Sequence, residues 1–237
     1  DLPPSHPVVD LGCGPGNSTE LLVKRFVGTD VLGVDNSPAM LASAKARLPQ
    51  VPFVLADIAD QAAWCAALTS APALIHANAA LQWVPHHDVV MPALMRALVP
   101  GGVLAIQMPD NWHEPSHRLM REVAARPPYA AHASDVARQP LLGIGAYYDL
   151  LAPWADHLDV WHTVFQHPMA DAGAIVQWLS GTGLRPYMAT MPSDVATAFL
   201  ADYQHEIEQA YPLRQDGKRL LAFPRLFLVA RRSHDAR

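Results

Sequence analysis

The sequence has few charged residues, few cysteines and no long apolar run. Only 16% of its 237 residues are charged, and the formal net charge of −5 leaves no basic excess for a nucleic-acid partner. Two cysteines, Cys13 and Cys65, are too few for a disulfide framework, and neither belongs to a Cys-x-x-Cys pair. No apolar run reaches the roughly 18 residues that a membrane-spanning helix needs, and the first residues lack a signal-peptide pattern. We therefore expect a cytoplasmic chain with reduced thiols that binds neither nucleic acid nor a membrane.

Short β-branched runs alternate with amphipathic helical patterns through the first half of the chain. This strict alternation predicts an α/β fold with a mostly parallel sheet and helices on both faces. Two later strand-like runs bring the expected strands to seven, and a further helical pattern follows the first of them. Strands are expected at residues 7–11, 31–34, 52–56, 73–77, 103–108, 160–167 and 220–231. Helices are expected at residues 18–25, 38–47, 61–68, 88–98 and 171–182.

The alternation stops near Pro109, where a segment rich in proline, histidine and tryptophan begins. The chain has 22 prolines, and this composition favours ordered loops and short helices over flexible linkers. We predict one domain over residues 1–237, with helical cap insertions over the active site at about 111–157 and 186–217.

The run "VVDLGCGPGNST" is a strand followed by a glycine loop and the start of a helix. Gly12, Gly14 and Gly16 permit positive φ and let a ligand approach the backbone closely. The spacing does not match the dinucleotide fingerprint, because the third glycine comes one residue too early, and a P-loop lysine is missing. Asp10 ends the strand with a negative charge, which repels a pyrophosphate and attracts a cationic amine. The loop therefore predicts a ligand that is not bound through a phosphate group.

Two further acids follow strands. Asp35 comes directly after the second expected strand, where a carboxylate can accept hydrogen bonds from both hydroxyls of a ribose. Asp57 ends the third expected strand in "VLADI". The carboxyl ends of neighbouring parallel strands open onto one crevice, so Asp10, Asp35 and Asp57 together favour one cationic adenosyl ligand.

In these motifs the chain resembles the class I S-adenosylmethionine-dependent methyltransferases, whose signature is similar to "VVDLGCGPG", the acid of "GVDNS" and the following "ADI". From residue 10 to residue 232 it further resembles the trans-aconitate 2-methyltransferase family, in "NSPAML", "HANAALQWVPHH", "GGVLAIQMPDNWHEPSH", "TGLRPY" and "LLAFPRLFLVARR". The resemblance implies a Rossmann-like sheet, S-adenosyl-L-methionine as cofactor, and esterification of a carboxylate of trans-aconitate or a close polycarboxylate. Family members carry a leading helix that helps close the cofactor site, and only a few residues precede the first strand here.

The resemblance also assigns the cofactor contacts residue by residue. It implies that the glycine loop and Asp10 hold the methionine part, that Asp35 holds the ribose, and that Asp57 and Ile58 flank the adenine. The segment from Asn78 to Trp83 would lie beside the sulfonium and the acceptor. The cofactor-binding residues predicted in this way are Asp10, Gly12, Gly14, Gly16, Asp35, Asp57, Ile58 and Asn78.

A carboxylate acceptor, with a pKa of about 4, is ionised at neutral pH and needs neither a general base nor a metal. The other carboxylates of a polycarboxylate need cations, and arginine pairs with them through two parallel hydrogen bonds. Arg225 in "AFPRLFLV" and Arg185 in "TGLRPY" are the candidates, because aromatic residues and prolines flank them. The alternatives are that Arg225 is an edge-strand residue reaching for water and that Arg185 is a cation at a helix C-terminus.

Further acceptor-side candidates are Gln82, Trp83, Tyr148 and His117. An aromatic face at Trp83 could meet the sulfonium by cation–π attraction, whereas the alternative is a buried core tryptophan. Tyr148 could donate its hydroxyl to a substrate carboxylate, although tyrosines in proline-rich caps often only pack. Asn78 is a polar residue at the end of an apolar strand, so we expect it to find a partner at the sheet edge.

The stretch "HEPSH" matches the His-Glu-x-x-His pattern of zinc proteases. Pro115 suits the first helical turn and would leave His113 outside the helix, so the two histidines would not share a helical face. We therefore predict no metal site there, and a helix from Pro115 onward could still bring His117 to the acceptor pocket. The pair His86 and His87 is expected to be an exposed turn.

Three alternatives stay open at this point. Another small-molecule or malonyl-carrier-protein carboxyl methyltransferase would share the same motifs. A nicotinamide-dependent dehydrogenase would share the sheet and Asp35, although the glycine spacing opposes it. A non-catalytic adenosyl-ligand sensor would share the cofactor site. The sequence does not indicate an oligomeric state.

Overall fold

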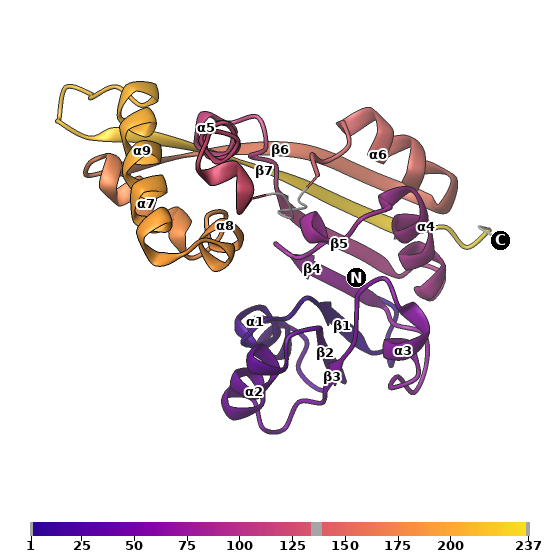
Figure 1. Ribbon diagram of the computed structural model, residues 1–237. Coiled ribbons are helices and arrows are strands. Elements are labelled where there is room, and N and C mark those ends of the chain that lie inside the picture. The colour runs from indigo at the N-terminus through magenta and orange to yellow at the C-terminus, as the bar shows by residue number, and fades with distance from the viewer. Residues whose placement is uncertain (1, 134–138, 236–237) are drawn as a thin grey trace. The chain divides into compact units, whose positions relative to one another are not determined.

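The computed structural model describes residues 2–133 and 139–235 and has an α/β architecture (Figure 1). The strands are β1 Val8–Leu11, β2 Val31–Asp35, β3 Phe53–Leu55, β4 Leu74–Asn78, β5 Val103–Pro109, β6 Ala155–Met169 and β7 Arg219–Arg232. The α-helices are α1 Asn17–Arg25, α2 Pro38–Arg47, α3 Gln61–Cys65, α4 His87–Ala97, α5 Pro115–Ala124, α6 Ile144–Leu151, α7 Ala172–Ser180, α8 Arg185–Thr190 and α9 Ser193–Ala210. Short 3-10 helices are η1 Leu81–Trp83, η2 Tyr129–Ala131 and η3 Ala152–Trp154.

The seven strands form one sheet in the order β3-β2-β1-β4-β5-β7-β6. Strands β1 to β5 pair in parallel, with Asp10 of β1 opposite Gly33 of β2 and His76 of β4. Every residue of β1 is buried, as expected for a central strand covered on both faces. The predicted mostly parallel sheet with seven strands is confirmed. Strand β6 begins at Ala155, five residues before its predicted start, and every other described strand lies within one residue of its predicted bounds.

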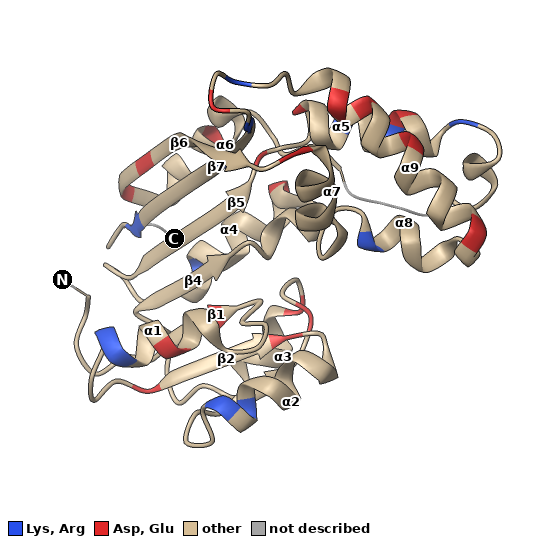
Figure 2. Ribbon diagram, turned by 90° about the vertical axis from the view of Figure 1, so that its left-hand side faces the viewer, with Lys and Arg blue, Asp and Glu red and all other residues tan. Residues whose placement is uncertain are grey.

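Local signals explain where the helices begin. Helix α2 starts at Pro38, and the Ser37 hydroxyl before it accepts a hydrogen bond from the Met40 amide at 3.4 Å. Helix α1 starts after Gly16, whose φ of +86° a residue with a side chain rarely adopts. Glu20 of α1 lies 2.6 Å from Lys24 and 3.2 Å from Arg47 of α2, so opposite charges meet between these helices (Figure 2).

The chain divides into two compact units. The first comprises Asp1–Met108, Leu141–His162 and Leu226–Arg237, and the second comprises Pro109–Pro140 and Thr163–Arg225. The predicted insertion at 186–217 falls within the second unit. The predicted insertion at 111–157 is divided, because residues 141–157 belong to the first unit. Its residues 134–138 lie outside the described residues, and the single domain over 1–237 stays a prediction.

Each unit has its own apolar core. The first core surrounds β1, β4 and β5 and includes Trp64 and Tyr147, both fully buried. The second core forms where α5 and α7 pack on α9, and Phe199 of α9 stacks with Tyr203 at a ring distance of 6.3 Å. Among the described residues, no helix combines the length and the apolarity needed to cross a membrane.

Candidate functional site at the carboxyl ends of the strands

The glycine loop follows the carboxyl end of β1 and is held against β2. The amides of Gly12 and Cys13 both donate to the Val34 carbonyl, at 2.8 and 3.0 Å. Gly12, Gly14 and Gly16 all have positive φ, at +68°, +54° and +86°. A Cβ on Gly14 would meet no atom within 4 Å, so the backbone there faces open space. The loop therefore leaves its main chain accessible at Gly14, and its contact with a cofactor stays a prediction.

Asp35 connects the glycine loop to the end of β2. Its Oδ2 accepts a hydrogen bond from the Gly14 amide at 2.9 Å, and its Oδ1 accepts one from the Ser37 amide at 2.8 Å. A carboxylate oxygen has two lone pairs, so each oxygen can still accept a further hydrogen bond. The side chain is half-buried and combines a fixed orientation with remaining acceptor capacity.

Asp10 is fully buried beneath the loop. Its Oδ2 accepts hydrogen bonds from the hydroxyls of Ser18 and Thr19, each at 2.7 Å, and its Oδ1 lies 2.8 Å from His76 Nδ1. These bonds join β1 to the first turn of α1 and to β4. The predicted contact of Asp10 with the methionine part stays a prediction, and what the structure adds is a supporting role for this carboxylate beneath the loop.

Sequence reasoning missed His76, Ser18 and Thr19 as partners of Asp10. Ser18 and Thr19 are eight and nine residues away along the chain, at the expected start of a helix. Their position in the sequence is therefore a signal that their hydroxyls can reach the Asp10 carboxylate. His76 is 66 residues away and comes opposite Asp10 only through the register of β4 against β1. A single sequence carries no signal for that pairing.

Asp57 and Ile58 follow β3. Asp57 is exposed, and its Oδ1 accepts a hydrogen bond from the Ala59 amide at 2.8 Å. Ile58 is buried, and its Cδ1 lies 3.5 Å from the position of a Cβ on Gly12. The structure thus brings Ile58 to the glycine loop, and the adenine-flanking role of Asp57 and Ile58 stays a prediction.

The segment after β4 also reaches the glycine loop. A Cβ on Gly12 would lie 2.2 Å from the Cβ of Ala80, so the two loops are in direct contact. Ala79 has a φ of +55°, which is uncommon for a residue with a side chain and tends to occur at functional sites. Asn78 is exposed at the end of β4, and within the described part of the chain its side chain makes no hydrogen bond, contrary to the expected partner at the sheet edge.

Gln82 and Trp83 lie in η1, immediately after this contact. Gln82 is buried, and its Nε2 donates to the Ala79 carbonyl at 2.7 Å. Its Oε1 is buried without a hydrogen-bond partner among the described residues, which is unusual for a polar atom. Trp83 is 50% exposed, so the alternative of a buried core tryptophan is wrong.

Burial governs the chemistry of the thiol inside the loop. Cys13 is buried, and burial, together with the negative charges of Asp10 and Asp35, raises the pKa of its thiol to about 12. The thiol is therefore neutral near pH 7 and is no nucleophile. Both cysteines are free thiols in the structure.

The predicted arginines belong to the second unit. Arg225 is half-buried and lies over the rings of Phe165 and Phe223, with 5.6 and 5.3 Å from its guanidinium carbon to the ring centres. Its strand, β7, has neighbours on both sides, so the edge-strand alternative is wrong. Arg185 is exposed and is the first residue of α8, which contradicts both the expected apolar surroundings and the alternative of a helix C-terminus.

The other acceptor-side candidates are divided between the units. Tyr148 of α6 is 51% exposed, whereas its neighbour Tyr147 is fully buried. His117 is buried in α5, with its Nδ1 3.0 Å from the Ser116 hydroxyl. Helix α5 begins at Pro115, so His113 precedes the helix, as predicted. Among the described residues, no group of three His, Cys, Asp or Glu side chains could hold a metal ion.

His87 corrects a prediction. His86 is exposed, as expected of a turn, but His87 is only 8% exposed. Both of its ring nitrogens have partners, the Leu81 carbonyl and the Tyr147 hydroxyl. The sequence hid this burial because Tyr147 is 60 residues away along the chain.

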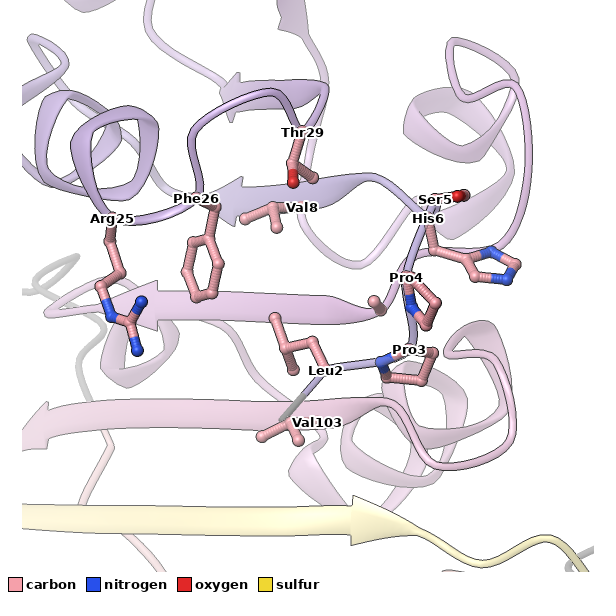
Figure 3. Close-up of a pocket in the computed structure, with 11 residues that line it drawn as sticks. Leu2, Pro3, Pro4, Ser5, His6, Val8, Arg25, Phe26, Thr29 and Val103 are labelled. Carbon is pink, nitrogen blue, oxygen red and sulfur yellow. The ribbon is translucent and has the colours of Figure 1, made fainter.

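A separate pocket of about 440 Å³ lies at the amino ends of the central strands (Figure 3). Val8 and Val103, the first residues of β1 and β5, line it together with Arg25, Phe26 and Thr29. The glycine loop follows the other end of β1, so this pocket is distinct from the candidate site, and none of the predicted site residues lines it.

Known proteins with similar sequences indicate the family of this chain. The family model for the methyltransferase domain matches residues 8–102. The trans-aconitate 2-methyltransferase of Variovorax paradoxus (strain S110) is 60% identical over 98% of this chain and 88% of its own length. The chain belongs to the trans-aconitate 2-methyltransferase family. Another member of that family, from Paracidovorax citrulli (strain AAC00-1), is 61% identical over 97% of this chain and 87% of its own length.

The fold of this family member is also found in solved structures. The YcgJ protein from Bacillus subtilis is similar with a TM-score of 0.61 and 14% sequence identity, over 99% of this chain and 94% of that protein. At this identity the likeness concerns the fold alone. The predicted methyltransferase family and Rossmann-like fold are confirmed, and the dehydrogenase alternative is wrong.

Proposed function

We propose that this chain transfers a methyl group from S-adenosyl-L-methionine to a carboxylate of trans-aconitate, the activity that its relatives' names state. The observation that carries the proposal is the contact between Gly12 and Ala80. It joins the loop assigned to the cofactor to the segment assigned to the acceptor, within a member of this family. A methyl transfer needs these two parts of a site to be adjacent.

The residues present fit the cofactor. Gly14 offers an open backbone, Asp35 retains acceptor capacity for ribose hydroxyls, and Ile58 supplies an apolar surface beside Gly12. The buried Oε1 of Gln82 is an acceptor without a partner among the described residues, as expected of an atom that a ligand donor would satisfy. When bound, S-adenosyl-L-methionine supplies a methyl group activated by a positive sulfur.

The protein's task is then to align the acceptor and to exclude water. A carboxylate acceptor is already ionised at neutral pH, so no side chain needs to remove a proton. We propose that Gln82 and Trp83 orient the acceptor, because the Gln82 amide nitrogen has a second N–H that can donate to a carboxylate, and Trp83 presents half of its surface. Asp10 acts as a positioning residue that holds α1 and β4 beneath the loop.

The assignments in the second unit stay predictions. Arg225 is the preferred partner of a substrate carboxylate, because its side chain is half-buried and its guanidinium lies over two aromatic rings. Exposed Arg185, exposed Tyr148 of the first unit and buried His117 follow as secondary candidates. The cytoplasmic location and the absence of a nucleic-acid partner also stay predictions.

The test is incubation of the purified chain with methyl-labelled S-adenosyl-L-methionine and a panel of acids. The panel contains trans-aconitate, cis-aconitate, citrate, isocitrate and a malonyl thioester, and the product is scored as base-labile methyl ester. We expect label on trans-aconitate above the other acids. Preference for the malonyl thioester would replace the substrate assignment, and cofactor binding without label on any acid would favour the sensor alternative.

A further inference from the structure

His87 is a buried histidine with both ring nitrogens engaged. Its Nε2 lies 2.9 Å from the Leu81 carbonyl oxygen, and its Nδ1 lies 2.6 Å from the Tyr147 hydroxyl. A carbonyl oxygen can only accept, so Nε2 carries a proton and donates it. In the neutral ring, Nδ1 then accepts a hydrogen bond from the Tyr147 hydroxyl. The two contacts therefore select one tautomer of a neutral imidazole.

The two partners of His87 belong to different elements. Leu81 is the first residue of η1, and the two residues after it are Gln82 and Trp83. Tyr147 is fully buried in α6, and both elements belong to the first unit. The Leu81 carbonyl also accepts the Val84 amide at 2.9 Å, so the turn that carries Gln82 and Trp83 is closed around this oxygen.

We propose that His87 is a positioning residue that fixes η1 on α6 and thereby orients Gln82 and Trp83 toward the methyl acceptor. The role of His87 toward the methyl acceptor rests on the proposed function. The placement of η1 does not, because it follows from the two contacts alone.

The neutral ring is the form that the surroundings favour. Burial lowers the pKa of His87, and the carbonyls of Leu81 and Val84 together with the charge of Asp88 oppose that shift. The polar groups facing the ring are thus the two carbonyls at η1, Asp88 on its own helix and the Tyr147 hydroxyl on α6. A second ring proton would turn Nδ1 into a donor, and the Tyr147 hydroxyl would have to rotate away.

The experiment compares His87→Ala, His87→Gln and Tyr147→Phe with the control His86→Asn. His86 is exposed with a φ of +58°, which asparagine tolerates. We expect His87→Ala to lower kcat for trans-aconitate by about 10- to 100-fold, as small misplacements near a reacting group do, with the Kd for S-adenosyl-L-methionine changed less than about threefold. We expect His87→Gln to recover part of kcat, because its amide can donate to Leu81.

Tyr147→Phe removes only the hydroxyl that donates to His87 and keeps the buried ring. It therefore tests the proposal even if His87→Ala does not fold. Without the hydroxyl donor, the neutral tautomer loses a partner, so we expect the acid limb of the kcat profile to move to higher pH. A purely structural role would lower stability and leave that limb in place. An unmoved acid limb, or a full kcat in folded His87→Ala, would overturn the proposal.

Hydrogen exchange over residues 79–86 separates this proposal from the proposed function. We expect faster exchange there in His87→Ala and unchanged exchange in His86→Asn, whether or not the wild-type chain methylates trans-aconitate. Faster exchange in a chain that labels no acid would leave the positioning role standing and remove the substrate assignment. Unchanged exchange in His87→Ala would remove the positioning role.

Discussion

Gly12 and Ala80 face each other across the candidate site, and a Cβ on Gly12 would lie only 2.2 Å from the Cβ of Ala80. Two loops that follow neighbouring strands, β1 and β4, therefore touch with no room for a side chain between them. This contact explains a glycine at position 12 more strongly than its φ of +68° alone, because the opposing atom belongs to a short, rigid side chain. It also couples any change in the glycine loop to the segment that carries Gln82 and Trp83.

Gly12→Ala is expected to reduce both stability and cofactor binding. A left-handed conformation costs a residue with a side chain about 1–2 kcal/mol, and the collision with Ala80 adds to that cost. Gly14→Ala meets no atom within 4 Å, so it should destabilise the fold less while still crowding the ligand. Urea unfolding and calorimetric binding of S-adenosyl-L-methionine measure the two effects. Equal stability losses in both variants would contradict the contact described above.

Asp35→Asn should weaken cofactor binding more than it weakens the fold. One of its two oxygens would be replaced by an amide that donates and cannot accept from Gly14 or Ser37, and an acceptor for the ribose hydroxyls would be lost. We expect the Kd for S-adenosyl-L-methionine to rise by at least about tenfold, the effect of losing one or two hydrogen bonds. Exposed Asp30→Asn is the matched control and should leave Kd unchanged.

His76→Ala removes a hydrogen-bond partner from the buried carboxylate of Asp10. Leaving a buried acceptor without its partner costs about 1–3 kcal/mol, so the free energy of unfolding should fall by that amount. The exposed pair of His157 and Asp159 has a similar distance, 2.9 Å, but water screens it. His157→Ala should therefore change the free energy of unfolding by less than about 0.5 kcal/mol. Comparable losses in the two variants would mean that burial of Asp10 contributes nothing.

Arg225→Gln tests the predicted carboxylate partner. We expect the KM for trans-aconitate to rise about 10- to 100-fold, the effect of losing a charged hydrogen bond, with the Kd for S-adenosyl-L-methionine unchanged. Arg231 of the same strand is exposed and pairs with Asp156 at 2.6 Å, so Arg231→Gln serves as the control. If both variants have the wild-type KM, Arg225 is not a substrate ligand.

Cys13 should resist alkylation in the folded chain. Its pKa is raised to about 12, so the reactive thiolate is nearly absent at pH 8, whereas Cys65 is less buried and should react first. Above about pH 9 the thiol ionises in the unfolded chain but not in the folded one. The unfolded chain then binds fewer protons, so the contribution of Cys13 to stability is lost as pH rises toward 12. Peptide mapping after iodoacetamide treatment, and urea unfolding of Cys13→Ser against pH, check both statements.

Periodicity and turn residues determined most of the elements that place the site. Strands β1, β2, β4 and β5 and helices α1, α2 and α4 lie within two residues of their predicted bounds, because buried parallel strands are continuous apolar runs and the helices alternate with them in a regular rhythm. The signals were weaker beyond Pro109. There the segment 141–157 was expected in a cap but belongs to the first unit, since its apolar residues Tyr147 and Leu151 join that core.

The sequence by itself determined the family, the parallel sheet and the polar residues at the carboxyl ends of its strands, because these depend on residue type and on spacing along the chain. The tertiary structure alone decided which residues distant in the sequence contact one another. Gly12 touches Ala80, Asp10 binds His76 and His87 binds Tyr147, and each pair is joined by strand register or helix packing. Contacts between residues 60 or more positions apart arise when the chain closes its core, and no local pattern records them.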